Sequence, residues 1–214
     1  MREGDLRGTR VLDVGCGTGS LAVVLAEQYA CKVWGVDASP EMLEVARAKV
    51  PEGVGLKLGR AEELPFKDGW FERVAATLAV HLWDRPRAFG EIARVLAPGG
   101  RFALASFNPA HFTGYYLNSY FPSILEIDTA RFAPAEVLVA ELVEAGFEDT
   151  RTASLTQQFS IGREAALARI RGRHISTFQL IPDEEYEEGA ARAERELPNR
   201  VDFTQHWLVV SAGT

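Results

Sequence analysis

The 214-residue sequence predicts a doubly wound α/β fold, in which helices cover both faces of a mostly parallel sheet. Three observations predict it. Short apolar runs alternate with segments of helical periodicity, a glycine-rich turn at 15–19 follows the first run, and an acidic residue, Asp37, ends the second. Such alternation requires crossover connections, which are right-handed between parallel strands.

The first half of the chain supplies five strands and three helices. Ser39 followed by Pro40 is a good helix start, because serine caps the first turn and proline fits its first position. Pro98-Gly99-Gly100 is typical of a helix end, and the run behind it is almost wholly apolar, as expected of a strand buried on both faces. We expect strands at 10–14, 32–36, 55–58, 71–77 and 101–106, and helices at 19–29, 39–49 and 86–96.

The last third of the chain is less regular. The amphipathic segment 135–145, followed by Gly146, predicts a helix, and 147–154 predicts a strand. Because no internal repeat and no low-complexity linker is found, we expect a single domain over 1–214. The remaining elements expected are helices at 163–171 and 183–197 and an apolar strand at 207–211.

Composition and charge exclude several classes of function. The net charge of −7 argues against broad nucleic-acid binding, which needs a basic face. The two cysteines, Cys16 and Cys31, do not suggest a disulfide framework, which fits a reducing cytosol. With no basic and apolar leader and no run of about 18 apolar residues, we expect a cytoplasmic protein without membrane insertion. No metal-ligand spacing and no Ser–His–Asp grouping stands out, so we expect no metal.

The glycine-rich turn carries the strongest functional signal. Asp13 precedes Gly15, Gly17 and Gly19, whose lack of a side chain allows a tight turn and a close approach to a ligand. Asp37 can accept two hydrogen bonds from a ribose diol. In a dinucleotide fold the third glycine comes one residue later, so a NAD- or FAD-type domain is the alternative. An ordinary tight turn explains the glycines but leaves Asp37 unexplained.

The motif resembles the D-x-G-x-G-x-G motif of the class I S-adenosylmethionine-dependent methyltransferases. The resemblance implies that the glycine N–H groups and the following helix dipole face the methionine half of the cofactor, while Asp37 holds its ribose. It places Asp13 near the cofactor's amino group, with a structural role in the loop as the alternative, and Met42 against adenine. Core packing is the alternative for Met42, as helix capping is for Asp37. The cofactor residues implied in this region are Asp13, Gly15, Cys16, Gly17, Thr18, Gly19, Asp37, Ala38 and Met42.

The segment 59–66 resembles the family stretch that reads adenine, usually Gly-Asp-Ala-Glu-x-Leu-Pro-Phe. Arg60 stands where that stretch has its acid, and an arginine cannot accept a bond from the adenine amino group. The resemblance therefore leaves three candidates for this contact: Glu62, a water molecule, or the N–H of Ala61 with packing.

The segment 77–84, after the fourth strand, also resembles the family, as does the stretch 91–100. It implies that Thr77 and Leu78 line the methionine–sulfonium end of the cofactor. His81 follows closely, and a neutral imidazole could act as a general base. The alternative is that His81 merely packs beside the cofactor, because positioning and desolvation can supply most of the rate of methyl transfer.

The resemblance is strong over 8–107, the cofactor-binding half, and holds only in outline beyond it. It implies a Rossmann-like sheet of seven strands with the last one antiparallel, and a helical substrate cover at 108–133 and 160–200. The aromatic-rich start of that cover suits a flat acceptor, or else forms a hydrophobic cluster. About nine residues precede the first strand, where the family usually has a helix, so we expect an upstream native start or closure by the last third.

The branch implied is that of small-molecule methyltransferases resembling the ubiquinone and menaquinone C-methyltransferases. The expected function is methyl transfer from S-adenosylmethionine to a small-molecule acceptor, with S-adenosylhomocysteine as the product. A protein that binds this cofactor without catalysis is the first alternative, and a NAD(P)-binding oxidoreductase is the second.

Overall fold

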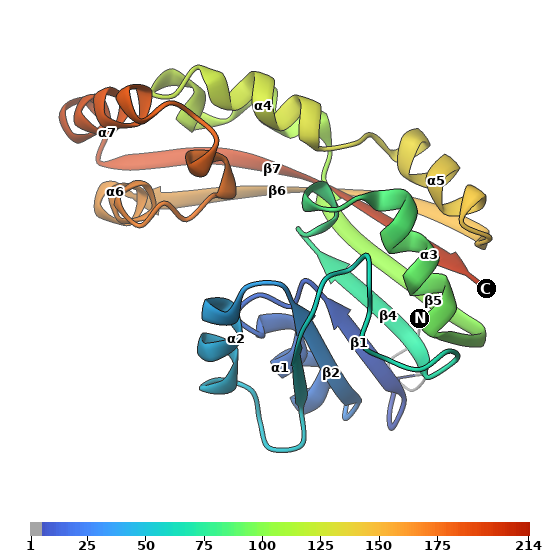
Figure 1. Ribbon diagram of the computed structural model, residues 1–214. Coiled ribbons are helices and arrows are strands. Elements are labelled where there is room, and N and C mark those ends of the chain that lie inside the picture. Colours follow the sequence, from blue (N-terminus) through green and yellow to red (C-terminus); the bar gives the residue numbers. More distant parts are fainter. Residues whose placement is uncertain (1–5) are drawn as a thin grey trace. The chain divides into compact units, whose positions relative to one another are not determined.

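Seven strands form one mixed sheet in the order β3-β2-β1-β4-β5-β7-β6 in the computed structural model, which describes residues 6–214 (Figure 1). The strands are β1 (Arg10–Val14), β2 (Lys32–Asp37), β3 (Gly55–Leu58), β4 (Phe71–Thr77), β5 (Leu96–Phe107), β6 (Glu148–Gly162) and β7 (Arg200–Gly213). The predicted doubly wound α/β fold is confirmed, and β1, β3 and β4 have the predicted bounds.

The first five strands are parallel. Val11 of β1 pairs with Val33 of β2 on one side and with Arg73 of β4 on the other. Val14 and Val36 pair at the carboxyl ends of β1 and β2. Because parallel strands end at the same edge of a sheet, the segments that follow β1, β2, β3 and β4 emerge together at one edge.

Helices connect the strands where the apolar periodicity predicts them. Ser39 caps α2 as expected, since its Oγ accepts the N–H of Met42 at 3.1 Å. The helices are α1 (Ser20–Glu27), α2 (Pro40–Arg47), α3 (Arg85–Val95), α4 (Ser123–Arg131), α5 (Ala135–Glu144), α6 (Arg163–Arg171) and α7 (Asp183–Glu196). Short 3-10 turns are η2 (Val80–Leu82), η3 (Pro109–Gly114), η4 (Tyr116–Ser119) and η5 (Ser176–Gln179).

Helix α3 ends just before Pro98-Gly99-Gly100, as predicted, but these residues already belong to an irregular start of β5, which begins at Leu96 and not at Arg101. Helix α3 stops at Val95, and Leu96 already pairs with Phe71. The N–H of Gly99 donates to the carbonyl of Thr214, and the N–H of Thr214 donates to Gly100. The segment thus keeps a turn, with Gly99 at a φ of +73°, while its backbone pairs with the end of β7.

β7 runs antiparallel to both of its neighbours. Thr156 lies across from His206 and Ser160 across from Asp202, so the residue numbers of β6 and β7 run in opposite directions. Figure 1 shows the same opposition of the two arrows. The reversed last strand is confirmed, although β6 and β7 extend well beyond the predicted 147–154 and 207–211.

Two compact units divide the chain, each with its own core. One consists of residues up to Ser106, with Ala135–Ala153 and Val209–Thr214. Its core contains Leu12, Val74, Phe89, Phe102 and Phe147, all at most 2% exposed.

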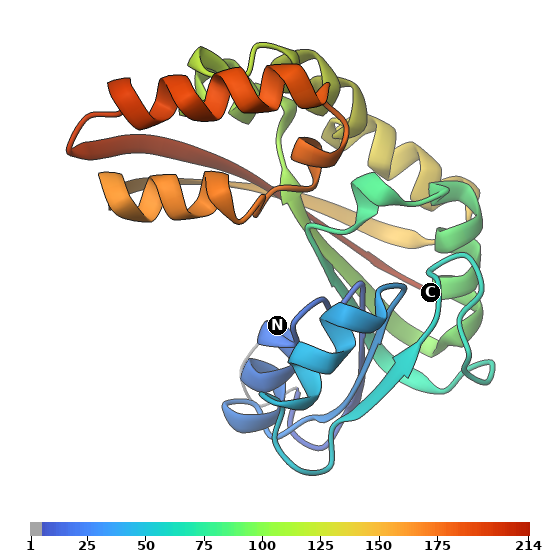
Figure 2. The ribbon, with the colours of Figure 1, turned by 60° about the vertical axis from the view of Figure 1, so that its left-hand side comes forward.

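The other unit consists of Phe107–Pro134 and Ser154–Leu208. Figure 2 shows α6 and α7 running alongside the outer parts of β6 and β7. Both predicted cover segments fall in this unit. Its core is formed by Phe121, Ile124, Leu167, Ile170, Phe178 and Ala193.

Within residues 6–214, no helix is both long and apolar enough to cross a membrane.

Candidate functional site

The glycine-rich turn and Asp37 face each other at the edge of the sheet. The turn joins β1 to α1, and Asp37 ends the neighbouring strand β2. Oδ2 of Asp37 accepts the N–H of Gly17 at 2.7 Å, and Oδ1 accepts the N–H of Ser39 at 2.9 Å. The second bond fits the capping alternative for Asp37. The first aims the carboxylate at the middle of the turn.

The three glycines of the turn meet different surroundings, although all have a positive φ. A Cβ on Gly15 would lie 2.5 Å from the Cβ of Ala79, and one on Gly19 would lie 2.9 Å from Val50. A Cβ on Gly17 would meet nothing within 4 Å. Gly15 and Gly19 therefore allow close packing, whereas Gly17 borders open space that a ligand can fill.

The expectation that the N–H groups of all three glycines face a ligand is wrong. The N–H groups of Gly15 and Cys16 both donate to the carbonyl of Val36, and that of Gly19 donates to Cys16. The turn satisfies its own polar groups because an unpaired buried N–H is costly. Free donors remain at the start of α1, whose first turn has neither a side-chain cap nor an acidic residue.

Thr18 and Cys16 fill the remaining positions of the turn. Thr18 is half-buried, and within residues 6–214 it makes no hydrogen bond. Cys16 is buried and lies against Gly35, where a Cβ would come within 2.8 Å of its sulfur. Burial, together with the charges of Asp13 and Asp37, raises the pKa of the Cys16 thiol to about 12, so the thiol is a protonated filler at neutral pH.

Asp13 is a buried carboxyl group with an incomplete set of partners. Its side chain is 1% exposed, and its Oδ2 has no hydrogen-bond partner among the residues that the structure describes. Burial, and next the negative charge of Asp37, raise the pKa of Asp13 to about 7. A buried carboxyl group with a second carboxylate nearby favours a cationic group between them.

Met42 and Ala38 lie at the surface beside Asp37. Met42 is 45% exposed, while Leu43 and Ala46 form the buried face of α2. Core packing, the alternative for Met42, is therefore wrong. Its exposed thioether side chain gives an apolar surface in the first turn of α2, close behind Asp37 in the chain.

Glu62 ties the loop between β3 and β4 to the start of α3. Its Oε1 accepts the N–H of Asp84 at 2.9 Å, and its Oε2 lies 3.3 Å from Nε of Arg60. The Arg60 side chain is 71% exposed, so it extends into solvent. Ala61, between them, is buried.

The backbone is strained at Leu78, directly after the carboxyl end of β4. Leu78 has a φ of +51°, which is uncommon for a residue with a branched side chain. Its N–H donates to the carbonyl of Ala105 at 2.8 Å, which holds the strained backbone in place. Thr77 is exposed just before it, and His81 is half-buried in η2 just after.

The sequence did not reveal that Glu91 and Arg94 of α3 hold the loop between β3 and β4 by hydrogen bonds to its backbone; these contacts are called the clamp below. Glu91 of α3 accepts the N–H of Leu64 at 2.7 Å, and Arg94 donates to the carbonyls of Leu64 and Phe66 at 3.0 and 2.9 Å. The same arginine pairs with Glu91 at 2.7 Å. The signal for it in the sequence is the i, i+3 spacing of an acid and an arginine on one helix face.

The aromatic segment after β5 is largely core. His111 is 2% exposed, Phe112 3% and Phe121 0%, and burial lowers the pKa of His111 to about 4. The alternative stated for this segment, a hydrophobic cluster, therefore holds for these three side chains. Helices α6 and α7 are joined by an ion pair between Arg171 and Glu194.

Among residues 6–214, no three His, Cys, Asp or Glu side chains are grouped as metal ligands.

Comparison with known proteins gives a consistent family. A profile described as a methyltransferase domain matches residues 12–104. A demethylmenaquinone methyltransferase of Listeria monocytogenes is 33% identical over 174 residues, which cover 77% of this chain and 72% of that protein. An uncharacterized methyltransferase of Mycobacterium tuberculosis is 50% identical over 95 residues, or 44% of this chain. That match spans only 38% of the mycobacterial protein, well under two thirds of its length.

Solved structures agree in fold. A methyltransferase ascribed to an antibiotic biosynthesis pathway of Anabaena variabilis superposes with a TM-score of 0.73 at 24% identity, over 95% of this chain and 90% of that one. Phosphoethanolamine N-methyltransferase 2 of Haemonchus contortus, solved with phosphomonomethylethanolamine and S-adenosylhomocysteine, gives 0.62 at 20% identity, over 98% of this chain and 49% of that one.

Proposed function

The chain belongs to the class I S-adenosylmethionine-dependent methyltransferases, and from this we propose that it transfers the methyl group of S-adenosylmethionine to a small-molecule acceptor. The observation that carries the proposal is the 2.7 Å bond from Gly17 to Asp37, which joins the two cofactor motifs at one sheet edge. The open space at Gly17 lies in the turn that follows β1, and the orphaned oxygen of Asp13 lies near the end of β1 itself.

The residues fit the parts of the cofactor. We assign the ribose diol to Asp37 and the ammonium group of the methionine moiety to Asp13. The methionine carboxylate faces the free N–H groups at the start of α1, where the helix dipole favours a negative charge. We assign adenine to the exposed side chain of Met42 and the N–H of Ala61, with Ala38 beside them. Thr77 and Leu78 line the reacting end.

When bound, the cofactor would supply a methyl group on a sulfonium sulfur. The acceptor's nucleophile would attack the methyl carbon in line, and the sulfur would leave as the neutral thioether of S-adenosylhomocysteine. The chain's own residues then need to orient the two reactants and exclude water. The strained Leu78 gives a fixed backbone for that purpose, since strain persists only where the surroundings hold it.

His81 is the candidate for a general base. It directly follows the carboxyl end of β4, where the reacting groups of this fold meet, and an imidazole titrates near neutral pH. We assign it removal of the acceptor's proton, which an acceptor with an ionised nucleophile would not require.

Two measurements test the proposal. Isothermal titration should give micromolar affinity for S-adenosylhomocysteine and no binding of NADH, and the opposite preference would establish the oxidoreductase alternative. Incubation with methyl-labelled S-adenosylmethionine and a pool of small metabolites should then move label into the small-molecule fraction. Binding without any transfer of label would identify a protein that holds the cofactor without catalysis.

A further inference from the structure

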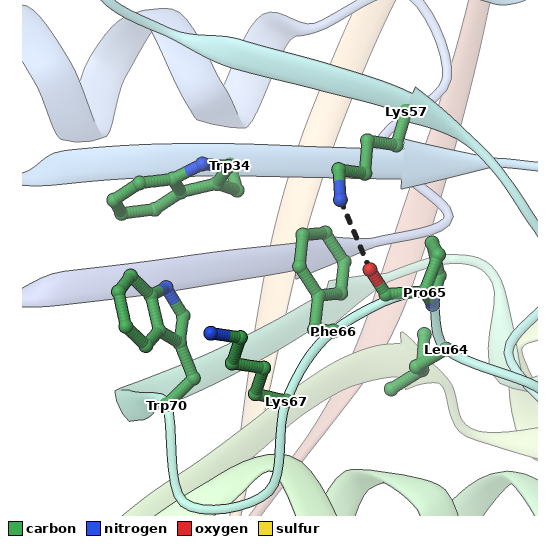
Figure 3. Close-up of a pocket in the computed structure, with 7 residues that line it drawn as sticks. All are labelled: Trp34, Lys57, Leu64, Pro65, Phe66, Lys67 and Trp70. Atoms are coloured by element: carbon green, nitrogen blue, oxygen red, sulfur yellow. Dashed lines mark hydrogen bonds between the residues drawn. The ribbon is translucent and has the colours of Figure 1, made fainter.

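A pocket lies along the sheet edge at β2 and β3, and we propose that it binds a flat aromatic anion. The pocket has a volume of about 500 Å³ and is closed by the loop between β3 and β4 (Figure 3). This proposal goes beyond methyl transfer and does not depend on it.

The pocket is separate from the cofactor residues. Side chains alternate between the faces of a strand, so Trp34 and Asp37, three residues apart on β2, point to opposite faces. Trp34 also lies about 10 Å before the carboxyl end of its strand, at roughly 3.3 Å for each residue. None of the residues assigned to the cofactor lines the pocket.

Three of its seven lining residues, Trp34, Phe66 and Trp70, are aromatic. The rings of Trp34 and Trp70 meet edge to face, with 6.4 Å between their centres. Phe66 stands across from them, and Figure 3 shows the side chain of Lys67 among the three rings. Walls of this kind favour a flat ligand, because rings pack well by stacking or edge-to-face contact.

The charge of the lining is positive. Its two charged side chains are Lys57 and Lys67, and the lining contains no acidic residue. Nζ of Lys57 donates to the carbonyl of Pro65 at 3.0 Å and lies 4.8 Å from the centre of the Phe66 ring. Within residues 6–214, Lys67 makes no hydrogen bond and no ion pair. Its ammonium group is therefore available to an anion.

The other polar groups are donors too. In the described part of the chain, neither indole N–H of Trp34 and Trp70 has a hydrogen-bond acceptor. A ligand that pairs with the ammonium group of Lys67 must bring acceptors, and a carboxylate or sulfonate on a ring system brings them at one end.

The walls are held in place by their surroundings. A Cβ on Gly55 would lie 2.6 Å from Cδ1 of Trp34, so only glycine lets this indole lie over β3. The guanidinium of Arg10 lies 4.9 Å from the centre of the Trp70 ring and is itself bound to Glu72 at 2.6 Å. Such preorganisation lowers the entropic cost of binding.

The experiment uses 2-naphthoate as the probe and the whole chain without cofactor. In ¹H–¹⁵N spectra, the indole N–H signals of Trp34 and Trp70 should shift saturably, while those of Trp83 and Trp207 should stay. Signals are assigned with W34F and W70F. Lys67→Met should weaken binding about tenfold, as expected for loss of one charge-assisted bond.

Matched controls make the result decisive. Lys49→Met removes another exposed lysine outside the pocket and should leave the affinity within about twofold, since no pocket contact is lost. The neutral 2-naphthamide and the non-aromatic cyclohexanecarboxylate should both bind more weakly than 2-naphthoate. Equal binding of either compound, an unchanged affinity in Lys67→Met, or no shift at Trp34 and Trp70 would overturn the proposal. Because no cofactor is present, none of these outcomes bears on methyl transfer.

Discussion

The carboxylate of Asp37 and the N–H of Gly17 are joined by a 2.7 Å hydrogen bond that links the ends of two adjacent strands. A carboxylate oxygen can accept more than one hydrogen bond. Asp37 can therefore hold the glycine turn and still accept the hydroxyls of a ribose diol. The turn is thus organised before any ligand arrives, which lowers the cost of binding.

Replacing Asp37 with alanine should weaken S-adenosylhomocysteine binding by roughly 2–4 kcal/mol, because two charge-assisted hydrogen bonds are lost. Isothermal titration measures the change. Asp37→Asn keeps the size and one acceptor, so it should lose less. An unchanged dissociation constant in Asp37→Ala would refute the ribose assignment.

Gly17→Ala and Gly15→Ala should separate binding from stability. The Cβ at Gly17 would enter open space, so the variant should fold with only the cost of its positive φ, about 1 kcal/mol, and yet bind the cofactor poorly. The Cβ at Gly15 would come 2.5 Å from Ala79, so that variant should unfold at lower denaturant concentration. Urea titration and calorimetric binding on both variants check this, and tight cofactor binding by Gly17→Ala would contradict it.

His81→Ala should lower turnover by a factor of about 10² or more and leave S-adenosylhomocysteine affinity within about twofold, because a general base acts on the acceptor's proton. The check compares kcat with the calorimetric dissociation constant. If kcat falls and the dissociation constant rises together, His81 packs beside the cofactor instead.

Stability of the free protein should depend on Asp13. Burial, followed by the charge of Asp37, raises the pKa of Asp13 to about 7, so between pH 4 and 7 the folded state holds a proton that the unfolded state has lost. The unfolding free energy should therefore fall through this window, on the order of 1 kcal/mol per pH unit, and level off above it. Asp13→Asn should remove this part of the slope. Urea titrations of both proteins at several pH values give the difference, in which other titrating groups cancel.

Cofactor binding should change the protonation of the same group. An ammonium group beside Asp13 favours its ionised form, so binding of S-adenosylhomocysteine near pH 6.5 should release a proton. Calorimetry in two buffers of different ionisation enthalpy detects the release. A binding heat independent of the buffer would argue against contact between Asp13 and the ammonium group.

Arg94→Met should destabilise the chain by roughly 2–3 kcal/mol, since the carbonyls of Leu64 and Phe66 lose their charged donor. Arg87→Met, on the same helix but exposed, is the matched control and should change stability by less than about 0.5 kcal/mol. Thermal unfolding of the two variants compares them, and equal melting temperatures would show that the clamp on this loop is unimportant.

The central strands could be predicted because each element there has its own local signal. β1 and β4 are apolar runs bounded by turn residues, and Ser39-Pro40 sets the start of α2. The long outer strands could not. Most of β6 is exposed, so its sequence lacks an apolar run, and its extension depends on pairing with β7.

The site, too, was predictable only where its signal is local in the sequence. The spacing of the glycines and of Asp37 is visible in the sequence, whereas the partners of Gly15 and Gly19 are not. The role of Glu62 also emerged only with Asp84 beside it, 22 residues further along the chain.

By itself, the sequence determined the order of strands and helices, the glycine turn and the acid that faces it, because these follow from local periodicity and residue type. The three-dimensional structure was needed to show that Leu96 already pairs with Phe71 in β5, that Met42 is exposed and that Asp13 is buried beside a second carboxylate. Those outcomes depend on contacts between residues far apart in the chain, and burial and charge at a position are set by such neighbours.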